Sequence, residues 1–271
     1  MLKRLIKTLI KNEYVQDQLR LVYNSAKTVT PNLLLEEIKL RKNGLPDGFP
    51  FPPQKLIFTV IAIPWVSEFY KSGKIIFDDM MKMFELNKID IKDNSNILDF
   101  GCGCGRIIRH FAAKNKYNLF GSDLNPDLIS WCGKNLSFGK FSVNNLVPPL
   151  NYPDNFFDLI YARSVFTHLG KELQQEWIAE MKRILKPGGI FYFTAHGKIT
   201  ISPLSKSEQE LFNKDEIVLH NSFGEGGNKY SSYQSYKWTT ENLLNGFDLA
   251  GFHEGGSNPH LKQDVYIFRK L

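Results

Sequence analysis

The chain has 271 residues, of which 42% are hydrophobic, and it carries a formal net charge of +6. This length and composition allow one domain plus an elaboration to bury a large core. They exclude a membrane-spanning segment, because the apolar stretch 56–66 is too short and Pro64 interrupts it, and a nucleic-acid partner is disfavoured because basic residues do not alternate with aromatic residues.

The first predicted element is a basic amphipathic helix over residues 1–12. Its apolar side chains share one helical face and its lysines lie elsewhere; the apolar set is Leu2, Leu5, Ile6 and Leu9. Such a helix either packs on the core of its own protein or lies on an anionic membrane. The first reading is favoured, and the second leaves peripheral membrane contact through residues 1–12 as an alternative.

Residues 13–94 continue with a loop and a second helical pattern. The segment 45–53 (LPDGFPFPP) is rich in proline and aromatic residues, so it forms neither a regular helix nor a central strand and is expected on the surface or at the rim of a site. After Ser67 a helical pattern carries Phe69, Ile76 and Met80 on one face. These apolar residues are predicted to pack on a sheet.

A glycine-rich loop follows the first predicted strand. Gly101, Gly103 and Gly105 alternate directly after an apolar run that ends in Asp99-Phe100. Glycine at every second position lets the chain turn sharply and lets a ligand approach bare backbone. A dinucleotide fingerprint, G-x-G-x-x-G, would place its third glycine at position 106, where this chain has Arg106. The loop therefore predicts a cofactor site that differs from the dinucleotide type, with a helix over 106–114 pointing its positive end at it.

Two of the three cysteines lie inside this loop. Cys102 and Cys104 have no nearby Cys or His cluster to complete four ligands, so no metal site is expected. Together with Cys132 they leave an unpaired third thiol, and no secretory leader is visible. Both features indicate a cytoplasmic protein.

Strands and helices alternate along the rest of the chain. Strands are predicted over 119–123, 141–145, 157–162 and 190–194, and a helix over 177–189 that is closed by Pro-Gly-Gly. A helix over 243–247 and two strands near 252–254 and 264–269 complete the pattern. This order predicts an α/β fold with a doubly wound, mostly parallel sheet and helices on both of its faces.

Two predicted strand ends carry side chains suited to a nucleoside. Asp123 ends a strand about twenty residues after the glycines, where a carboxylate can accept both ribose hydroxyls of an adenosine. Asp123 also fits the cap of the next helix, and the two roles are compatible. Asn144 and Asn145 follow the next strand, where their amides can meet an adenine edge.

These motifs together resemble the class I S-adenosylmethionine-dependent methyltransferase family, close to its small-molecule and glycan-associated branch. The resemblance covers roughly residues 95–196 and rests on 98–105, Asp123, 157–169 and 185–193. It implies a Rossmann-like domain over 95–271 with seven strands, the last antiparallel, and S-adenosyl-L-methionine as cofactor. It also implies that residues 1–94 form a lid. The cofactor-binding residues it implies are Asp99, Gly101, Cys102, Gly103, Gly105, Asp123, Leu124, Asn144, Asn145 and Ala162.

An insertion in this domain is predicted over about 197–238. It contains a capping box at Ser205 and Glu208, and then glycines near 224–227 followed by clustered tyrosines. Two interpretations stand equal: a flexible lip with aromatic walls suited to a sugar or ring-containing acceptor, or an ordinary hairpin whose tyrosines cover the sheet edge.

Two histidines are candidate catalytic residues. Methyl transfer from a sulfonium is an in-line displacement that mainly requires a held acceptor, and a base helps when the acceptor is a hydroxyl. His168 follows the fourth strand at the ligand-binding edge of the sheet, and His196 follows the fifth. The alternative for both is a structural role in capping a helix or bonding to backbone. His110, inside a helix, is predicted to be structural.

The predicted activity is methyl transfer to an oxygen or nitrogen of a small-molecule or glycan acceptor. Residues 162–165 (ARSV) carry neither the Pro-Pro-aromatic signature of base-amine methylation nor a Pro-Cys nucleophile for cytosine C5. Two other classes stay open: a non-catalytic S-adenosylmethionine-binding or membrane-docked scaffold, and an NAD(P)-dependent oxidoreductase, which Arg106 disfavours. No motif assigns the acceptor or an oligomeric state.

Overall fold

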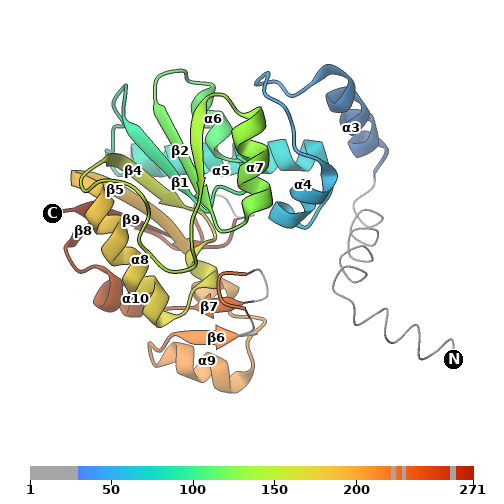
Figure 1. Cartoon of the computed structure of the whole chain (residues 1–271). Coiled ribbons are helices and arrows are strands. Elements are labelled where there is room, and N and C mark those ends of the chain that lie inside the picture. The colour runs from blue at the N-terminus through green and yellow to red at the C-terminus, as the bar shows by residue number, and fades with distance from the viewer. Residues whose placement is uncertain (1–29, 221–223, 228–229, 257–260) are drawn as a thin grey trace, which may run out of the picture.

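The computed structural model describes residues 30–220, 224–227, 230–256 and 261–271 (Figure 1). The helix expected over residues 1–12, with its membrane contact, lies outside these residues. Within them, no helix has the length and apolar character needed to span a bilayer.

A seven-stranded sheet forms the centre of the fold. Its strand order is β3-β2-β1-β4-β5-β9-β8. The first five are parallel to one another, whereas β9 runs antiparallel to both β5 and β8. The predicted α/β fold with its antiparallel last strand is confirmed. The strands are β1 (Asn96–Phe100), β2 (Asn118–Asp123), β3 (Gly139–Val143), β4 (Phe157–Ala162), β5 (Leu185–Ala195), β8 (Phe247–His253) and β9 (Asp264–Lys270).

Helices bury both faces of this sheet because alternate strand residues point to opposite sides. Leu98, Ile160 and Phe191 pack toward α8 (Lys171–Ile184) and α10 (Tyr236–Leu243). Their neighbours Ile97, Leu159 and Ile190 pack toward α5 (Val66–Leu86) and α6 (Ile108–Ala112). Near the second of these faces, α7 (Pro126–Asn135) contacts β2 and β3. Both faces of the sheet are therefore covered by side chains, and the carboxyl ends of its parallel strands are where a ligand site can form.

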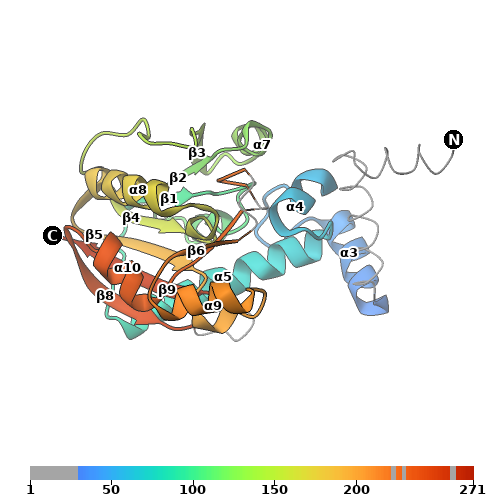
Figure 2. The ribbon, with the colours of Figure 1, turned by 90° about the horizontal axis from the view of Figure 1, so that it is seen from below.

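The segment before the sheet forms three helices. They are α3 (Pro31–Asn43), α4 (Gln54–Ile61) and α5, and Figure 2 shows α5 running from beneath the sheet out to the other two. Glu37 of α3 accepts hydrogen bonds from the backbone N–H groups of Val66 and Ser67 at the start of α5. The side chain thereby satisfies amides that the first turn of a helix leaves free. The lid function of residues 1–94 stays a prediction.

A buried ion pair holds the proline-rich segment onto the sheet domain. The Arg109 guanidinium donates to Asp47 at 2.5 Å and to the carbonyl oxygens of Phe49 and Pro50 at 3.1 and 3.0 Å. Arg109 is fully buried and the Asp47 side chain is only 2% exposed. One cation therefore fixes a segment that has no regular structure of its own.

The insertion contains a helix and a separate two-stranded sheet. The helix is α9 (Lys206–Asn213), and its predicted capping box at Ser205 and Glu208 is confirmed. Strands β6 (Val218–His220) and β7 (Ser231–Tyr233) pair antiparallel, as the hairpin interpretation expects. Short 3-10 turns, η1 (Phe166–His168) and η2 (Lys198–Thr200), follow β4 and β5.

Several predicted boundaries were wrong, each for a local reason. The glycine loop continues as turns to Ile107, so α6 starts two residues later than expected and ends at Ala112. The helix expected to end at Gly189 stops at Ile184, because Leu185 already pairs with Phe157 and a bulge then absorbs the Pro-Gly-Gly residues into β5. β3 lies two residues earlier than predicted. The helix expected over 243–247 ends at Leu243.

Candidate functional site

A cavity of about 630 Å³ lies at the carboxyl edge of the parallel strands. Loops after β1, β2, β3 and β4 line it, together with α4 and a loop of the insertion. This is the edge at which open α/β sheets bind their ligands. Its lining includes Thr59, Val60, Gly101, Gly103, Arg106, Asp123, Leu124, Asn144, Asn145, Arg163, Ser164, His168, Trp177, Gly226 and Gly227.

The glycine loop forms one wall of the cavity by a backbone path that other residues resist. Gly101, Gly103 and Gly105 have φ values of 78°, 56° and 76°. A Cβ atom on Gly101 would lie 2.3 Å from the Cγ2 atom of Val165, and one on Gly105 would lie 2.5 Å from Leu136. The loop therefore needs glycine both for its conformation and for its close packing.

Asp123 ties this loop to the next strand. One carboxylate oxygen accepts from the Gly103 N–H at 2.8 Å, and the other accepts from the Asn125 N–H at 2.9 Å. Asn125, and not Asp123, caps α7, since its side chain accepts from the N–H groups of Asp127 and Leu128. Burial raises the pKa of the Asp123 carboxyl. Asp123 thus orients the glycine backbone and still lines the cavity.

The ten predicted cofactor residues divide into two layers. Six line the cavity: Gly101, Gly103, Asp123, Leu124, Asn144 and Asn145. The other four, Asp99, Cys102, Gly105 and Ala162, are buried behind that lining. Burial raises the pKa of the Asp99 carboxyl to about 7, which nearby Asp123 reinforces and Arg106 opposes. Their roles in binding a cofactor stay predictions.

The cysteines belong to the buried layer. Cys102, Cys104 and Cys132 are free thiols, and burial raises the pKa of Cys102 and Cys104. The Cys102 and Cys132 thiols both point at the carbonyl oxygen of Gly103, at 3.5 Å. In the described residues, no group of three or more metal-ligating side chains gathers.

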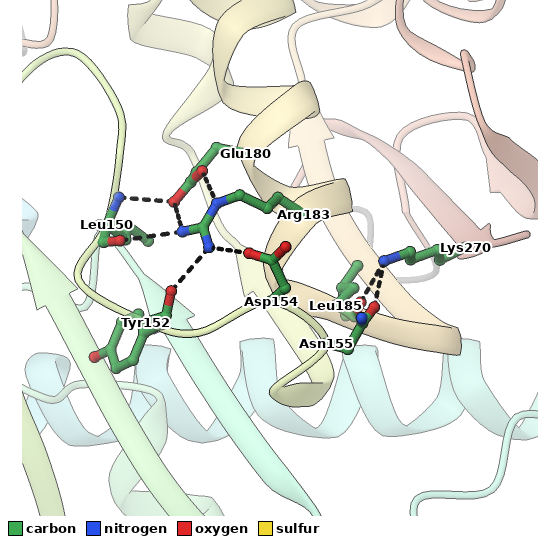
Figure 3. A network of polar contacts seen from close by, with 8 residues as sticks. All are labelled: Leu150, Tyr152, Asp154, Asn155, Glu180, Arg183, Leu185 and Lys270. Carbon is green, nitrogen blue, oxygen red and sulfur yellow. Dashed lines mark hydrogen bonds and ion pairs between the residues drawn. The ribbon is translucent and has the colours of Figure 1, made fainter.

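A polar network fixes the β3–β4 loop that carries Asn144 and Asn145 (Figure 3). Glu180 of α8 accepts from the Leu150 N–H at 2.7 Å, and Arg183 donates to the Leu150 and Tyr152 carbonyl oxygens. Arg183 also pairs with Asp154, and these carboxylates raise the pKa of its guanidinium. Nearer the cavity, the Trp177 indole donates to the Leu146 carbonyl oxygen at 3.0 Å. One helix therefore anchors the loop at several points.

His168 lies on the cavity wall in a defined orientation. Its Nδ1 is 2.6 Å from the carbonyl oxygen of Tyr230. A carbonyl oxygen only accepts, so Nδ1 carries the hydrogen and the neutral ring has its lone pair on Nε2. The His168 carbonyl oxygen also accepts from the Gly226 N–H at 2.9 Å. The geometry equips Nε2 to take a proton from a ligand.

His196, the other catalytic candidate, is placed differently. It does not line the cavity. Its ring stacks on Tyr233 with centroids 4.8 Å apart, and its Nε2 accepts from the Gln263 amide at 3.5 Å. Burial lowers its pKa to about 4, so the ring is neutral at neutral pH. Burial does the same to His110 in α6, which matches its predicted structural place.

The strands of the insertion agree with the hairpin interpretation, and its described residues give the cavity no aromatic wall. Its strands form an ordinary hairpin and its residues Tyr230 and Tyr233 are buried. Its loop nevertheless reaches the cavity, where Gly226 lies against Leu146 and Leu124. Backbone, and not an aromatic wall, is what the described part of the loop contributes.

Two cavity-lining cations had no predicted role. In the sequence motifs, Arg106 stands where a dinucleotide fingerprint has its third glycine, and Arg163 belongs to the segment after the fourth strand. Both line the cavity. The available signal was position, since each directly follows a ligand-binding strand or loop.

Comparison with known proteins adds to this geometry. Residues 98–193 match the family described as methyltransferase domain. A phosphoethanolamine N-methyltransferase of Plasmodium falciparum is 28% identical over 112 residues, which cover 40% of this chain and 42% of that protein. An ajmaline N-methyltransferase of Rauvolfia serpentina is 27% identical over 53% of this chain and 50% of its own length. A sterol 24-C-methyltransferase of Schizosaccharomyces pombe is 33% identical over 38% and 28%. The matches thus span half or less of each of these relatives.

Solved structures share the fold. A SAM-dependent methyltransferase from Methanosarcina mazei superposes with a TM-score of 0.52 at 22% identity, covering 67% of this chain and 94% of that one. An S-adenosylmethionine-dependent methyltransferase from Mesorhizobium loti gives 0.51 at 15% identity, covering 72% and 100%.

Proposed function

We propose that this chain, which carries a class I S-adenosylmethionine-dependent methyltransferase domain and uses that cofactor, is an enzyme. It methylates an oxygen or nitrogen of a small-molecule or glycan acceptor. The observation that supports it best is the shared cavity. The glycine loop, Asp123 and Asn144 line the same space as His168. The groups proposed to bind the cofactor and the group proposed to accept a proton therefore line one cavity.

The lining fits the cofactor. The positive φ values at Gly101 and Gly103 expose backbone on which a ligand can lie, and Asp123 offers a carboxylate to ribose hydroxyls. The Asn144 amide donates to the Asn145 carbonyl oxygen at 2.8 Å, and its own oxygen is buried without a partner among the described residues. Such an oxygen can accept a hydrogen bond from a donor such as an adenine amine. Leu124 adds an apolar surface, 41% exposed.

The chemistry asks little more of the protein. S-adenosylmethionine supplies an activated methyl group, so the chain has to hold an acceptor atom in line and remove its proton. His168 Nε2 is the base that the geometry supports, because the Tyr230 carbonyl fixes Nδ1 as the protonated nitrogen. Trp177 and Val165 line the cavity as well and help to exclude water.

The acceptor class draws on the relatives. The named relatives act on phosphoethanolamine, ajmaline and sterols, as their names state, and these are small molecules. The cavity of about 630 Å³ has the size of a small-molecule site. Both facts favour a small acceptor over a protein or nucleic acid.

Calorimetric titration with S-adenosylmethionine, S-adenosylhomocysteine and NAD tests the proposal. We expect both sulfur compounds to bind and NAD not to bind. Binding of NAD alone would assign an oxidoreductase. Binding of the cofactor with no turnover by wild-type protein across a broad acceptor panel would favour a non-catalytic scaffold.

A further inference from the structure

Two arginines line the cavity without a carboxylate partner. Arg106 donates to the Ser72 hydroxyl at 3.2 Å, and within the described ranges neither Arg106 nor Arg163 forms an ion pair. Burial, together with the positive charge of Arg163 and partly opposed by the Asp99 carboxyl, lowers the pKa of Arg106 to about 10. The two cations are thus close enough to repel each other. A charge that is partly buried and unpaired is costly unless a ligand compensates for it.

Arg163 forms hydrogen bonds to neutral groups only. It donates to the Thr194 and Ser164 hydroxyls at 2.9 and 3.1 Å and to the Leu261 carbonyl oxygen at 3.4 Å. Burial lowers its pKa, and the carboxylate of Asp79 partly opposes this through its charge. A guanidinium has five N–H donors, so three bonds leave donors for a ligand.

The neutral groups are themselves oriented by one side chain. The amide oxygen of Gln263 accepts from the Ser164 hydroxyl at 3.0 Å and from the Thr194 hydroxyl at 2.8 Å. Each hydroxyl has then given its hydrogen away and can only accept from Arg163. The network therefore sets the guanidinium in one place and does not neutralise it.

The positions of the two arginines separate their roles. Arg106 directly follows the glycine loop, so a cofactor bound along that loop would have its single carboxylate within the range of Arg106 first. Arg163 directly follows β4, and Ser164 and Val165 continue from it to η1, which ends at His168. One carboxylate accounts for one fork of donors, and Arg163 then has no anion hydrogen-bonded to it among the described residues.

We infer that Arg163 binds an oxyanion carried by the methyl acceptor, a carboxylate or a phosphate monoester, beside the group that His168 deprotonates. This inference rests on the proposed function and narrows it to acidic acceptors. Gln263 is a positioning residue for Arg163, since it touches the guanidinium only through Ser164 and Thr194.

Anion binding to the cofactor-loaded protein tests this inference. Protein saturated with S-adenosylhomocysteine, which fills the cofactor's own carboxylate position, is titrated with inorganic phosphate and with acetate at constant ionic strength. The shift of the unfolding midpoint gives each dissociation constant. We expect at least one anion to bind, and the tighter of the two to identify the acidic group.

Two variants locate the bound anion. Because a hydrogen bond to a charged group contributes about 1.5–3 kcal/mol, Arg163→Gln is expected to weaken anion binding by about 10- to 100-fold. Its affinity for S-adenosylhomocysteine should stay within about threefold of wild type. Arg269→Gln removes an exposed arginine of β9 far along the chain and should change neither value.

The outcomes separate the two proposals. Failure of S-adenosylhomocysteine to bind overturns the proposed function, and the anion titration of the unloaded protein then still compares Arg163→Gln with wild type. If neither anion binds wild type, or if Arg163→Gln binds anions as tightly as wild type, the inference about Arg163 is wrong.

Discussion

Two guanidinium sites in this molecule, one fully buried and one partly buried at the cavity, are built in opposite ways. Arg109 meets the carboxylate of Asp47 and two backbone carbonyl oxygens, so its charge is paired and its Nε and Nη2 donors are satisfied inside the protein, whereas Nη1 has no partner among the described residues. Arg163 meets two hydroxyls and one carbonyl oxygen, and no carboxylate bonds to it among the described residues. The first site stabilises the fold, and the second leaves its positive charge available to a ligand.

The contrast shows how one residue type serves two purposes. Arg109 joins the segment 45–53 to the sheet domain, and its cavity-facing neighbour Arg106 comes only three residues earlier. Substituting a paired, buried arginine is expected to lower the stability of the fold. Substituting an unpaired arginine in a cavity is expected to lower the affinity for a ligand.

The largest expected effect is the loss of the structural pair. Arg109→Gln leaves the Asp47 carboxylate buried with no cation, so the free energy of unfolding should fall by about 3–5 kcal/mol in chemical denaturation. The matched control is Lys71→Gln, which breaks the exposed ion pair with Glu36 and should cost about 0–1 kcal/mol. A loss below about 1 kcal/mol for Arg109→Gln would contradict a structural role.

The second prediction concerns the buried carboxyl beneath the glycine loop. Because the pKa of Asp99 is raised from 3.8 to about 7, the folded state holds its proton more tightly than the unfolded state does. Its contribution to stability is therefore full below pH 4 and is lost as the pH rises toward 7. Asp99→Asn, measured without cofactor, should gain about 2–3 kcal/mol over wild type between pH 5 and pH 8. An equal pH dependence in both proteins would show that Asp99 is ionised when folded.

The third prediction tests the base. His168→Gln should lower kcat by about 100-fold or more, because a positioned general base contributes at least that much. Its unfolding free energy and its affinity for S-adenosylhomocysteine should stay close to wild type, since glutamine can still donate to the Tyr230 carbonyl oxygen. His196→Gln serves as the comparison and should retain more activity, because His196 does not line the cavity. If His196→Gln lost more activity than His168→Gln, the role of general base would belong to His196 instead of His168.

The smallest expected effect lies in the cofactor half of the cavity. Asp123→Asn keeps the shape of the side chain but loses its charge, and the affinity for S-adenosylhomocysteine should fall by about 10- to 100-fold. Calorimetry measures this directly, with Asp248→Asn, at an exposed position of β8 outside the cavity lining, as the control. Equal affinities for Asp123→Asn and wild type would remove Asp123 from the binding site.

Sequence patterns predicted the sheet well because its signals are local. A short, largely apolar run marks each of β1, β2 and β4; glycine follows β1 and an acidic residue ends β2. β4 is followed by Arg163, and it matches the prediction at both ends. The start of β5 was missed because a proline and two glycines normally end a strand, and only the pairing of Leu185 with Phe157 shows otherwise.

The part of the site that depends on local sequence signals was predicted, and the part that depends on tertiary contacts was not. The glycine loop and Asp123 are close in sequence to the strands that position them. The state of Arg163 depends on Gln263, which is about a hundred residues away, and on Thr194 of another strand. The orientation of His168 likewise depends on Tyr230 of the insertion. Such tertiary contacts leave no periodic mark in the chain.

The structure of the complex with S-adenosylhomocysteine tests the central claim most directly, because it shows which arginine the cofactor uses. We expect the cofactor against the glycine loop, its carboxylate on the Arg106 side, and its sulfur facing a free space bounded by Arg163 and His168. A cofactor carboxylate bonded to Arg163, or a sulfur turned away from His168, would contradict the division of this cavity into a cofactor half and an acceptor half.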